Sequence, residues 1–154
     1  METMLKVTNL SKNFGGVKAV NDLSLTVNKG EICAIIGPNG SGKTTSINLI
    51  TGVLTPDSGD IQYNGYSINN MSRHERAKHG ITRTFQNLRI FSTLSILDHV
   101  MVGCYPRSDS SFLSCTFLSR AARAEEKANR AKSFDLLRLV GLEGKEHLAA
   151  KSLS

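Results

Sequence analysis

Residues 37–44 combine three glycines, a lysine and a threonine at the spacing of a phosphate-binding loop, Gly-Pro-Asn-Gly-Ser-Gly-Lys-Thr. Glycines let backbone N–H groups converge on phosphate oxygens, because no Cβ blocks their approach. Lys43 can reach the β- and γ-phosphates of a nucleotide, and the Thr44 hydroxyl can ligate Mg²⁺. The pattern therefore predicts a site for the phosphates of a nucleotide.

Two other interpretations of this loop carry less weight. A chance glycine turn would match the four constrained positions in fewer than about one chain in a hundred of this size. A dinucleotide-binding loop would need a glycine where Thr45 stands. The flanks favour phosphate binding, because an apolar strand candidate precedes the loop and a helix candidate follows it from Lys43 to about Ile50.

Other residues that could do chemistry form no complete motif. His74 and Glu75 begin like a zinc-protease motif, but Lys78 occupies the position of the second histidine. A basic stretch with only Glu75 opposing it comprises Arg73, Arg76, Lys78, Arg83 and Arg89. No nucleic-acid-binding module surrounds this stretch. We therefore expect it to form a solvated face, or one that faces lipid headgroups and a partner, with no nucleic-acid partner.

The strands that must position the loop are predicted from apolar patterning. Residues 4–10 and 23–27 partly alternate apolar with polar side chains, as half-buried antiparallel strands do. Residues 32–36 are continuously apolar, which is typical of a strand covered on both faces. Further strands are expected at residues 61–63 and 81–86.

Helices are predicted from capping signals and periodicity. Gly52 is placed to end the helix that follows the loop, and Ser72, with Glu75 three residues on, to begin another that runs to about Lys78. A third is expected from Ala121 to near Gly141. Its apolar stripe would comprise Ala124, Ala128, Ala131, Phe134 and Leu137. We therefore expect an α/β portion over residues 1–88 and a helical portion over residues 89–154.

Composition excludes or disfavours several classes of protein, among them disordered, disulfide-rich and membrane-spanning chains. With 40% hydrophobic and 21% charged residues among 154, the chain can bury a core and is not wholly disordered. The net charge of +6 favours anionic partners without choosing among them. Three cysteines without paired spacing disfavour a disulfide framework, so a reducing cytoplasm fits best. The longest apolar run, residues 32–36, falls far short of the roughly 20 residues that span a bilayer, and no signal peptide is expected.

The loop and its flanks resemble the Walker A region of ABC-transporter ATP-binding subunits. Residues 10–15, Leu-Ser-Lys-Asn-Phe-Gly, precede the loop where that family places an adenine-stacking aromatic side chain. Residues 56–61 follow where the family has a turn and a strand, and residues 84–87, Thr-Phe-Gln-Asn, fall at its Q-loop. The resemblance implies a partial ABC ATP-binding domain over residues 1–154. Its fold would be an α/β phosphate-loop NTPase core with N-terminal antiparallel strands and a following helical subdomain.

A subfamily is indicated by longer stretches. Residues 80–91 and 94–103 are similar to one of the two ATPase subunits of branched-chain amino-acid importers, as is the insertion from Cys104 to about Ala121. ABC subunits that serve lipopolysaccharide, urea or other amides are close relatives and stay as alternatives.

The resemblance implies ATP and Mg²⁺ as cofactors and assigns roles residue by residue. Phe14 would stack on adenine, the alternative being a core residue under the turn at residues 15–16. Gln86 would touch Mg²⁺ or the attacking water, so Lys43 and Gln86 are the candidate catalytic residues and Thr44 and Gln86 the candidate metal ligands. The candidate nucleotide-binding residues are Phe14, Gly37, Pro38, Asn39, Gly40, Ser41, Gly42, Lys43, Thr44 and Thr45.

The implied partners are the membrane permease subunits of an importer and a second ATPase subunit, with the protein peripheral at the cytoplasmic face of the inner membrane. Apolar residues after Gln86 would line the groove for the permease's coupling helix. Phe91, Leu94 and Ile96 are therefore expected to be partly exposed, together with residues 110–119.

The end of the sequence bears on activity. The family's signature begins Leu-Ser-Gly-Gly-Gln, and residues 152–154 read Ser-Leu-Ser. We expect the Walker B aspartate, the catalytic glutamate and the switch histidine to lie beyond this point, and the 154-residue chain alone to be inactive. Alternatives are a truncated, non-catalytic nucleotide-binding remnant and another phosphate-loop enzyme such as a small-molecule kinase, against which Phe14 and Gln86 argue.

Overall fold

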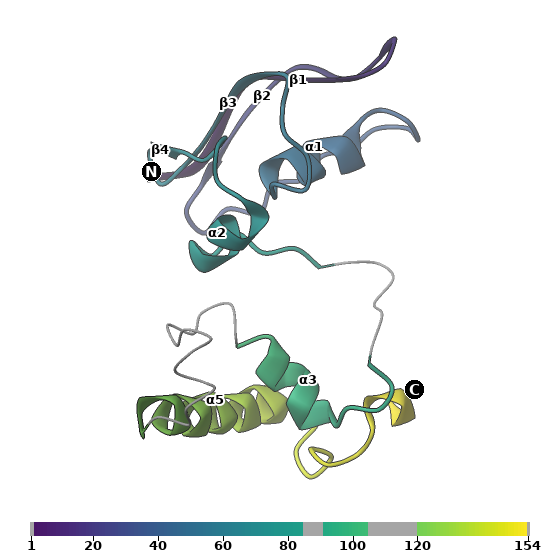
Figure 1. Ribbon diagram of the computed structural model, residues 1–154. Helices are drawn as coiled ribbons and strands as arrows, with labels where there is room; N and C mark the ends of the chain where they lie inside the picture. The colour runs from purple at the N-terminus through teal and green to yellow at the C-terminus, as the bar shows by residue number, and fades with distance from the viewer. Residues whose placement is uncertain (1, 85–90, 105–119, 154) are drawn as a thin grey trace. The chain divides into compact units, whose positions relative to one another are not determined.

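A computed structural model describes residues 2–84, 91–104 and 120–153 (Figure 1). The chain divides into two compact units, Met1–Arg83 and Thr84–Ser154. Within the described ranges no helix is both long and apolar enough to cross a membrane. The assignment of residues 1–88 and 89–154 as functional subdomains stays a prediction.

The first unit is built on a four-stranded antiparallel sheet with the order β2-β1-β3-β4. The strands are β1 (Thr3–Phe14), β2 (Val17–Asn28), β3 (Ser58–Tyr63) and β4 (Tyr66–Ser67). The predicted strands at 4–10, 23–27 and 61–63 are therefore confirmed, the first two as parts of longer strands. A bulge between Val7 and Leu10 interrupts the two-residue alternation, which lets both side chains enter the core although they are three positions apart.

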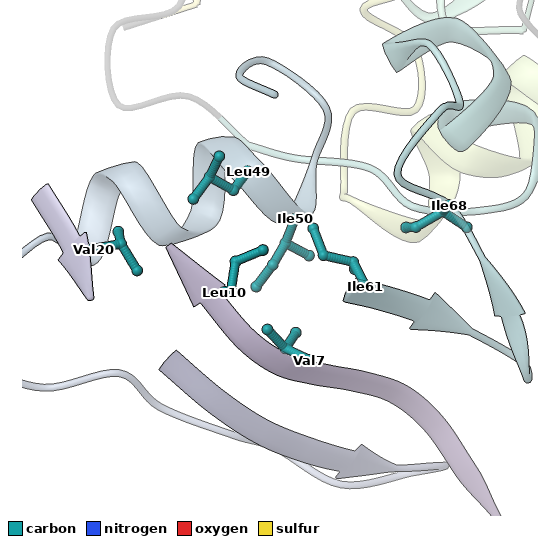
Figure 2. Close-up of a cluster of buried hydrophobic side chains, with 7 residues drawn as sticks. All are labelled: Val7, Leu10, Val20, Leu49, Ile50, Ile61 and Ile68. Carbon is teal, nitrogen blue, oxygen red and sulfur yellow. The ribbon is translucent and has the colours of Figure 1, made fainter. Parts of the chain in front are cut away.

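The core of this unit lies between the sheet and α1 (Lys43–Ile50) (Figure 2). Leu49 and Ile50 supply the helix side of the core, and Figure 2 shows Ile50 pointing from the helix toward the strand residues. The buried set comprises Val7, Leu10, Val20, Leu49, Ile50, Ile61 and Ile68. This packing fixes the C-terminal half of α1 on the sheet and so determines where the start of the helix points.

Two predicted strands are wrong for this structure. Residues 32–36 form no strand, and Ile32 and Ile36 are 98% and 89% exposed. Burial on both faces needs neighbouring strands and covering layers, and no strand in the described part of the chain pairs with this segment. Residues 81–84 are likewise not a strand, and residues 85–86 lie outside the described residues.

The helix boundaries follow the local signals. Gly52 adopts a φ of 74° immediately after the C-cap of α1, as its predicted role requires. The second helix, α2 (Arg73–Lys78), begins with a capping box in which the Ser72 side chain accepts from Glu75 N and the Glu75 carboxylate accepts from Ser72 N. Hydrogen bonds from Ser72 hold the pKa of Glu75 below its usual value.

The second unit contains α3 (Ile96–Val102), α5 (Arg120–Leu139) and a 3₁₀ turn, η2 (Ala150–Ser152). Ile96, Leu97 and Leu137 form its core, where α3 packs on α5. The helix predicted from residue 121 is confirmed, but its expected stripe is not buried as a whole. Of that stripe only Leu137 is buried, and the buried position one turn before it is Ser133.

Candidate nucleotide-binding site

The phosphate loop ends at Gly42, whose backbone only glycine can adopt at this position. Its φ is 86°, and a Cβ there would lie 2.1 Å from the carbonyl oxygen of Ala19 in β2. Gly40 also has a left-handed φ, 84°, with open space around it. The loop therefore packs closely against β2 at Gly42, whereas no side chain obstructs the space around Gly40.

Lys43 folds back over the loop that precedes it. Its Nζ donates to the carbonyl oxygens of Gly37 and Pro38, each at 2.7 Å. The ammonium therefore lies at the mouth of the loop, and a phosphate would exchange for these two carbonyl partners. Thr44, directly after Lys43, is exposed, and Thr45 is partly buried.

The N-terminus of α1 differs from those of α2 and α3 in having no anionic or side-chain cap. Gly42 provides no capping hydrogen bond, and the first turn of α1 contains no acidic residue. In α3, by contrast, Ser95 caps the helix and Asp98 lies in the first turn, and α2 has its capping box. The leading N–H groups of α1 and its positive dipole end are thus left to an external anion.

Phe14 stands at the end of β1, in the hairpin that contacts the phosphate loop. It pairs with Val17 of β2, and Ala19, two residues further along β2, is the residue against which Gly42 packs. The residue is 48% exposed and is not part of the buried core. An aromatic face is therefore accessible to a ligand at the phosphate-loop end of the sheet.

Arg76 is buried, which the sequence analysis did not predict. It is 1% exposed, whereas the basic stretch was expected to form a solvated face. Its guanidinium donates five hydrogen bonds to backbone carbonyls, those of Leu49, Ile50, Ile68, Asn69 and Met71. Two of these carbonyls belong to the last turn of α1. Burial lowers the pKa of Arg76 from its usual value. No local pattern distinguishes Arg76 from its basic neighbours, so only the fold identifies it.

A second member of the basic stretch also turns toward α1. Arg83 donates a hydrogen bond from its guanidinium to the side-chain oxygen of Asn48. The expectation of a solvated basic face is thus wrong for Arg76 and incomplete for Arg83. Arg73 and Lys78 are exposed, and Arg89 lies outside the described residues.

The remaining predicted residues fall in the second unit or outside the described ranges. Gln86 and residues 110–119 lie outside the described residues. Phe91 is exposed and Leu94 is partly buried, as expected for an apolar docking surface. Ile96 is not, because its side chain belongs to the core of the second unit, and the expectation of exposure is wrong there.

The chain is similar to proteins of one known family. The family model described as "ABC transporter" matches residues 20–154. The chain is 36% identical over 124 residues to the high-affinity branched-chain amino acid transport ATP-binding protein BraF of Pseudomonas aeruginosa, covering 80% of this chain and 49% of that protein. It is 38% identical over 125 residues to the lipopolysaccharide export system ATP-binding protein LptB of Escherichia coli, covering 81% and 48%.

Solved structures give the same result. An ATP-binding cassette of an ABC transporter in its ADP conformation matches with a TM-score of 0.81 at 34% identity, covering all of this chain and 60% of the cassette. A nucleotide-free cassette from an ABC transporter matches with a TM-score of 0.78 at 35% identity, covering 99% and 59%. The chain thus spans about half the length of these curated relatives and about three-fifths of these cassettes.

Proposed function

Because this chain belongs to the ABC transporter family, we propose that it serves as the ATP-binding, energy-coupling part of an ABC importer. The observation that carries the proposal is the uncapped N-terminus of α1 beside Lys43 and the glycine loop. The N-termini of α2 and α3 have a serine and a carboxylate in that place. The N-terminus of α1 is therefore suited to bind an anionic ligand such as a phosphate group.

Each residue of the site has a proposed part in binding. Lys43 exchanges its two carbonyl partners for β- and γ-phosphate oxygens, and backbone N–H groups of residues 40–45 bind the remaining oxygens. Mg²⁺ is commonly held by one or two protein oxygens together with substrate phosphates, and the hydroxyl of Thr44, an exposed residue, fits that role. Phe14 stacks on the base. Gln86 is proposed to contact either Mg²⁺ or the attacking water.

For the transported substrate we propose branched-chain amino acids. Support comes from BraF and from the probable branched-chain amino acid transport ATP-binding protein LivG of Methanocaldococcus jannaschii, 36% identical over 140 residues. LptB keeps a lipopolysaccharide system as an alternative. The proposed partners are permease subunits and a second ATPase subunit, with the chain peripheral at the cytoplasmic face of the membrane.

Replacing Phe14 with alanine tests the assigned nucleotide site. We expect affinity for ATP and GTP to fall alike, by about 1–3 kcal/mol of lost stacking. Equilibrium titration with a fluorescent nucleotide, displaced by ATP or GTP, measures the change. Tyr66→Ala removes an exposed aromatic side chain from β4 and serves as the control. Unchanged affinity for both nucleotides in Phe14→Ala would refute the stacking role.

We also propose that the 154-residue chain binds nucleotide without turning it over. Phosphoryl transfer needs groups that hold Mg²⁺ and orient the attacking water. The residues proposed for this site supply an ammonium, hydroxyls and the amides of Asn39 and Gln86, but no carboxylate. Steady-state phosphate release from Mg²⁺ATP should equal that of the Lys43→Ala variant. Release clearly above that background would mean that an acidic group elsewhere in the chain completes the site.

A further inference from the structure

The end of β1 is paired with β2 on one side, and on the side of β3 the Asp57 side chain bonds to it. The register between β1 and β3 ends at the Ser11–Ser58 pair, yet β1 continues to Phe14. Asp57, in the turn before β3, bonds to the part that continues: its Oδ2 accepts from Asn13 N at 2.7 Å. The carboxylate therefore provides the acceptor that a longer β3 would otherwise provide.

The other carboxylate oxygen of Asp57 fixes Lys12. Oδ1 accepts from Lys12 Nζ at 2.6 Å, and the Lys12 side chain is largely buried. This places the ammonium over the ring of Phe14, 5.9 Å from its centroid. The Lys12 and Asn13 hydrogen bonds hold the pKa of Asp57 below its usual value, so the carboxylate is ionised at neutral pH.

These contacts make one connected unit of Asp57, Lys12 and Phe14. The ammonium lies over the ring, and Phe14 is still 48% exposed, so part of the residue is open to a ligand. The backbone bond to Asn13 fixes the residue next to Phe14 along the strand. Loss of the carboxylate would release both constraints at once.

We propose that Asp57 is a positioning residue for nucleotide binding, which holds Phe14 in place for the base through Lys12 and the Asn13 backbone. The inference rests on the proposed stacking role of Phe14. It adds a residue from a turn more than 40 positions away in the sequence, and Asp57 itself touches neither base nor phosphate in this scheme.

The test is Asp57→Asn, which keeps the side-chain shape and removes the charge. Affinity for MgATP should fall by about threefold to tenfold, a part of the roughly fivefold to 150-fold that full loss of stacking costs. Affinity for magnesium tripolyphosphate, which has no base, should not change. In a Phe14→Ala background, Asp57→Asn should have no further effect on MgATP.

Asp60→Asn is the matched control. Asp60 accepts from Ser67 Oγ and Gln62 Nε2 within the same sheet and has no described contact with the end of β1. If Asp57→Asn fails to fold, Lys12→Met removes the ammonium and leaves the Asn13 bond, and it should show the same ligand pattern at smaller size.

The outcomes separate this inference from the proposed function. A loss of affinity for tripolyphosphate equal to that for MgATP, or a full effect in the Phe14→Ala background, would overturn the positioning role. Normal MgATP binding by Asp57→Asn, with weakened binding by Phe14→Ala, would do the same and leave the stacking role intact. Normal binding by Phe14→Ala would reject the stacking role itself.

Discussion

Arg76→Met should lower the free energy of unfolding of the first unit by about 3–5 kcal/mol, because buried carbonyls lose their donors. Two of its five acceptors keep another partner, since Gly52 N also donates to Leu49 O and Met71 N to Ile68 O. The carbonyls of Ile50, Asn69 and Met71 depend most on the guanidinium. Each unsatisfied buried acceptor costs about 1–3 kcal/mol.

Urea unfolding followed by circular dichroism measures this loss. The control is Arg73→Met, which removes an exposed arginine from the same helix and should change stability by less than about 0.5 kcal/mol. Arg76→Lys should be intermediate, because an ammonium has three donors where the guanidinium has five. Equal midpoints for the Met variants at positions 73 and 76 would show that the buried hydrogen bonds contribute nothing.

Lys43→Ala should weaken binding of triphosphate more than binding of adenosine. The variant removes the ammonium that donates to the Gly37 and Pro38 carbonyls of the loop, and hydrogen bonds to charged groups contribute about 1.5–3 kcal/mol each. We therefore expect MgATP affinity to fall about tenfold to 150-fold. Adenosine affinity should stay within experimental error, because Phe14 is unaltered.

Isothermal titration with MgATP and with adenosine separates the two contributions. Lys78→Ala removes an exposed lysine from α2 and controls for the change in net charge. An equal loss of affinity for both ligands in Lys43→Ala would place the lysine outside the phosphate site. A loss confined to MgATP would support the assigned role.

Features that depend on neighbouring residues could be predicted from the sequence. The capping box of α2 needs only Ser72 and Glu75, and the end of α1 needs only a glycine after Thr51. The glycine requirement at position 42 was also predicted from the loop pattern. For the two helix ends the interacting groups lie within a few positions of one another, so a local pattern contains the physical cause; at Gly42 the pattern predicted the glycine, but the close approach of the Ala19 carbonyl appears only in the fold.

Features set by distant contacts could not be predicted. The burial of Arg76 depends on carbonyls of residues 49–50 and 68–71, which meet only when the sheet and α1 have packed. The hold of Asp57 on Lys12 joins positions 45 residues apart. Residues 32–36 have the composition of a buried strand, but burial also requires a partner that composition does not specify.

The exposure of Ile32 and Ile36 has a practical consequence for handling the 154-residue chain in solution. Each side chain left in water forgoes about 1.5–3 kcal/mol relative to full burial. Any surface that covers both recovers that free energy, including the same segment of another molecule, and within the described residues no strand pairs with the backbone of this segment. The apparent molecular mass should therefore rise with protein concentration, and dilute samples are the suitable ones for all binding measurements.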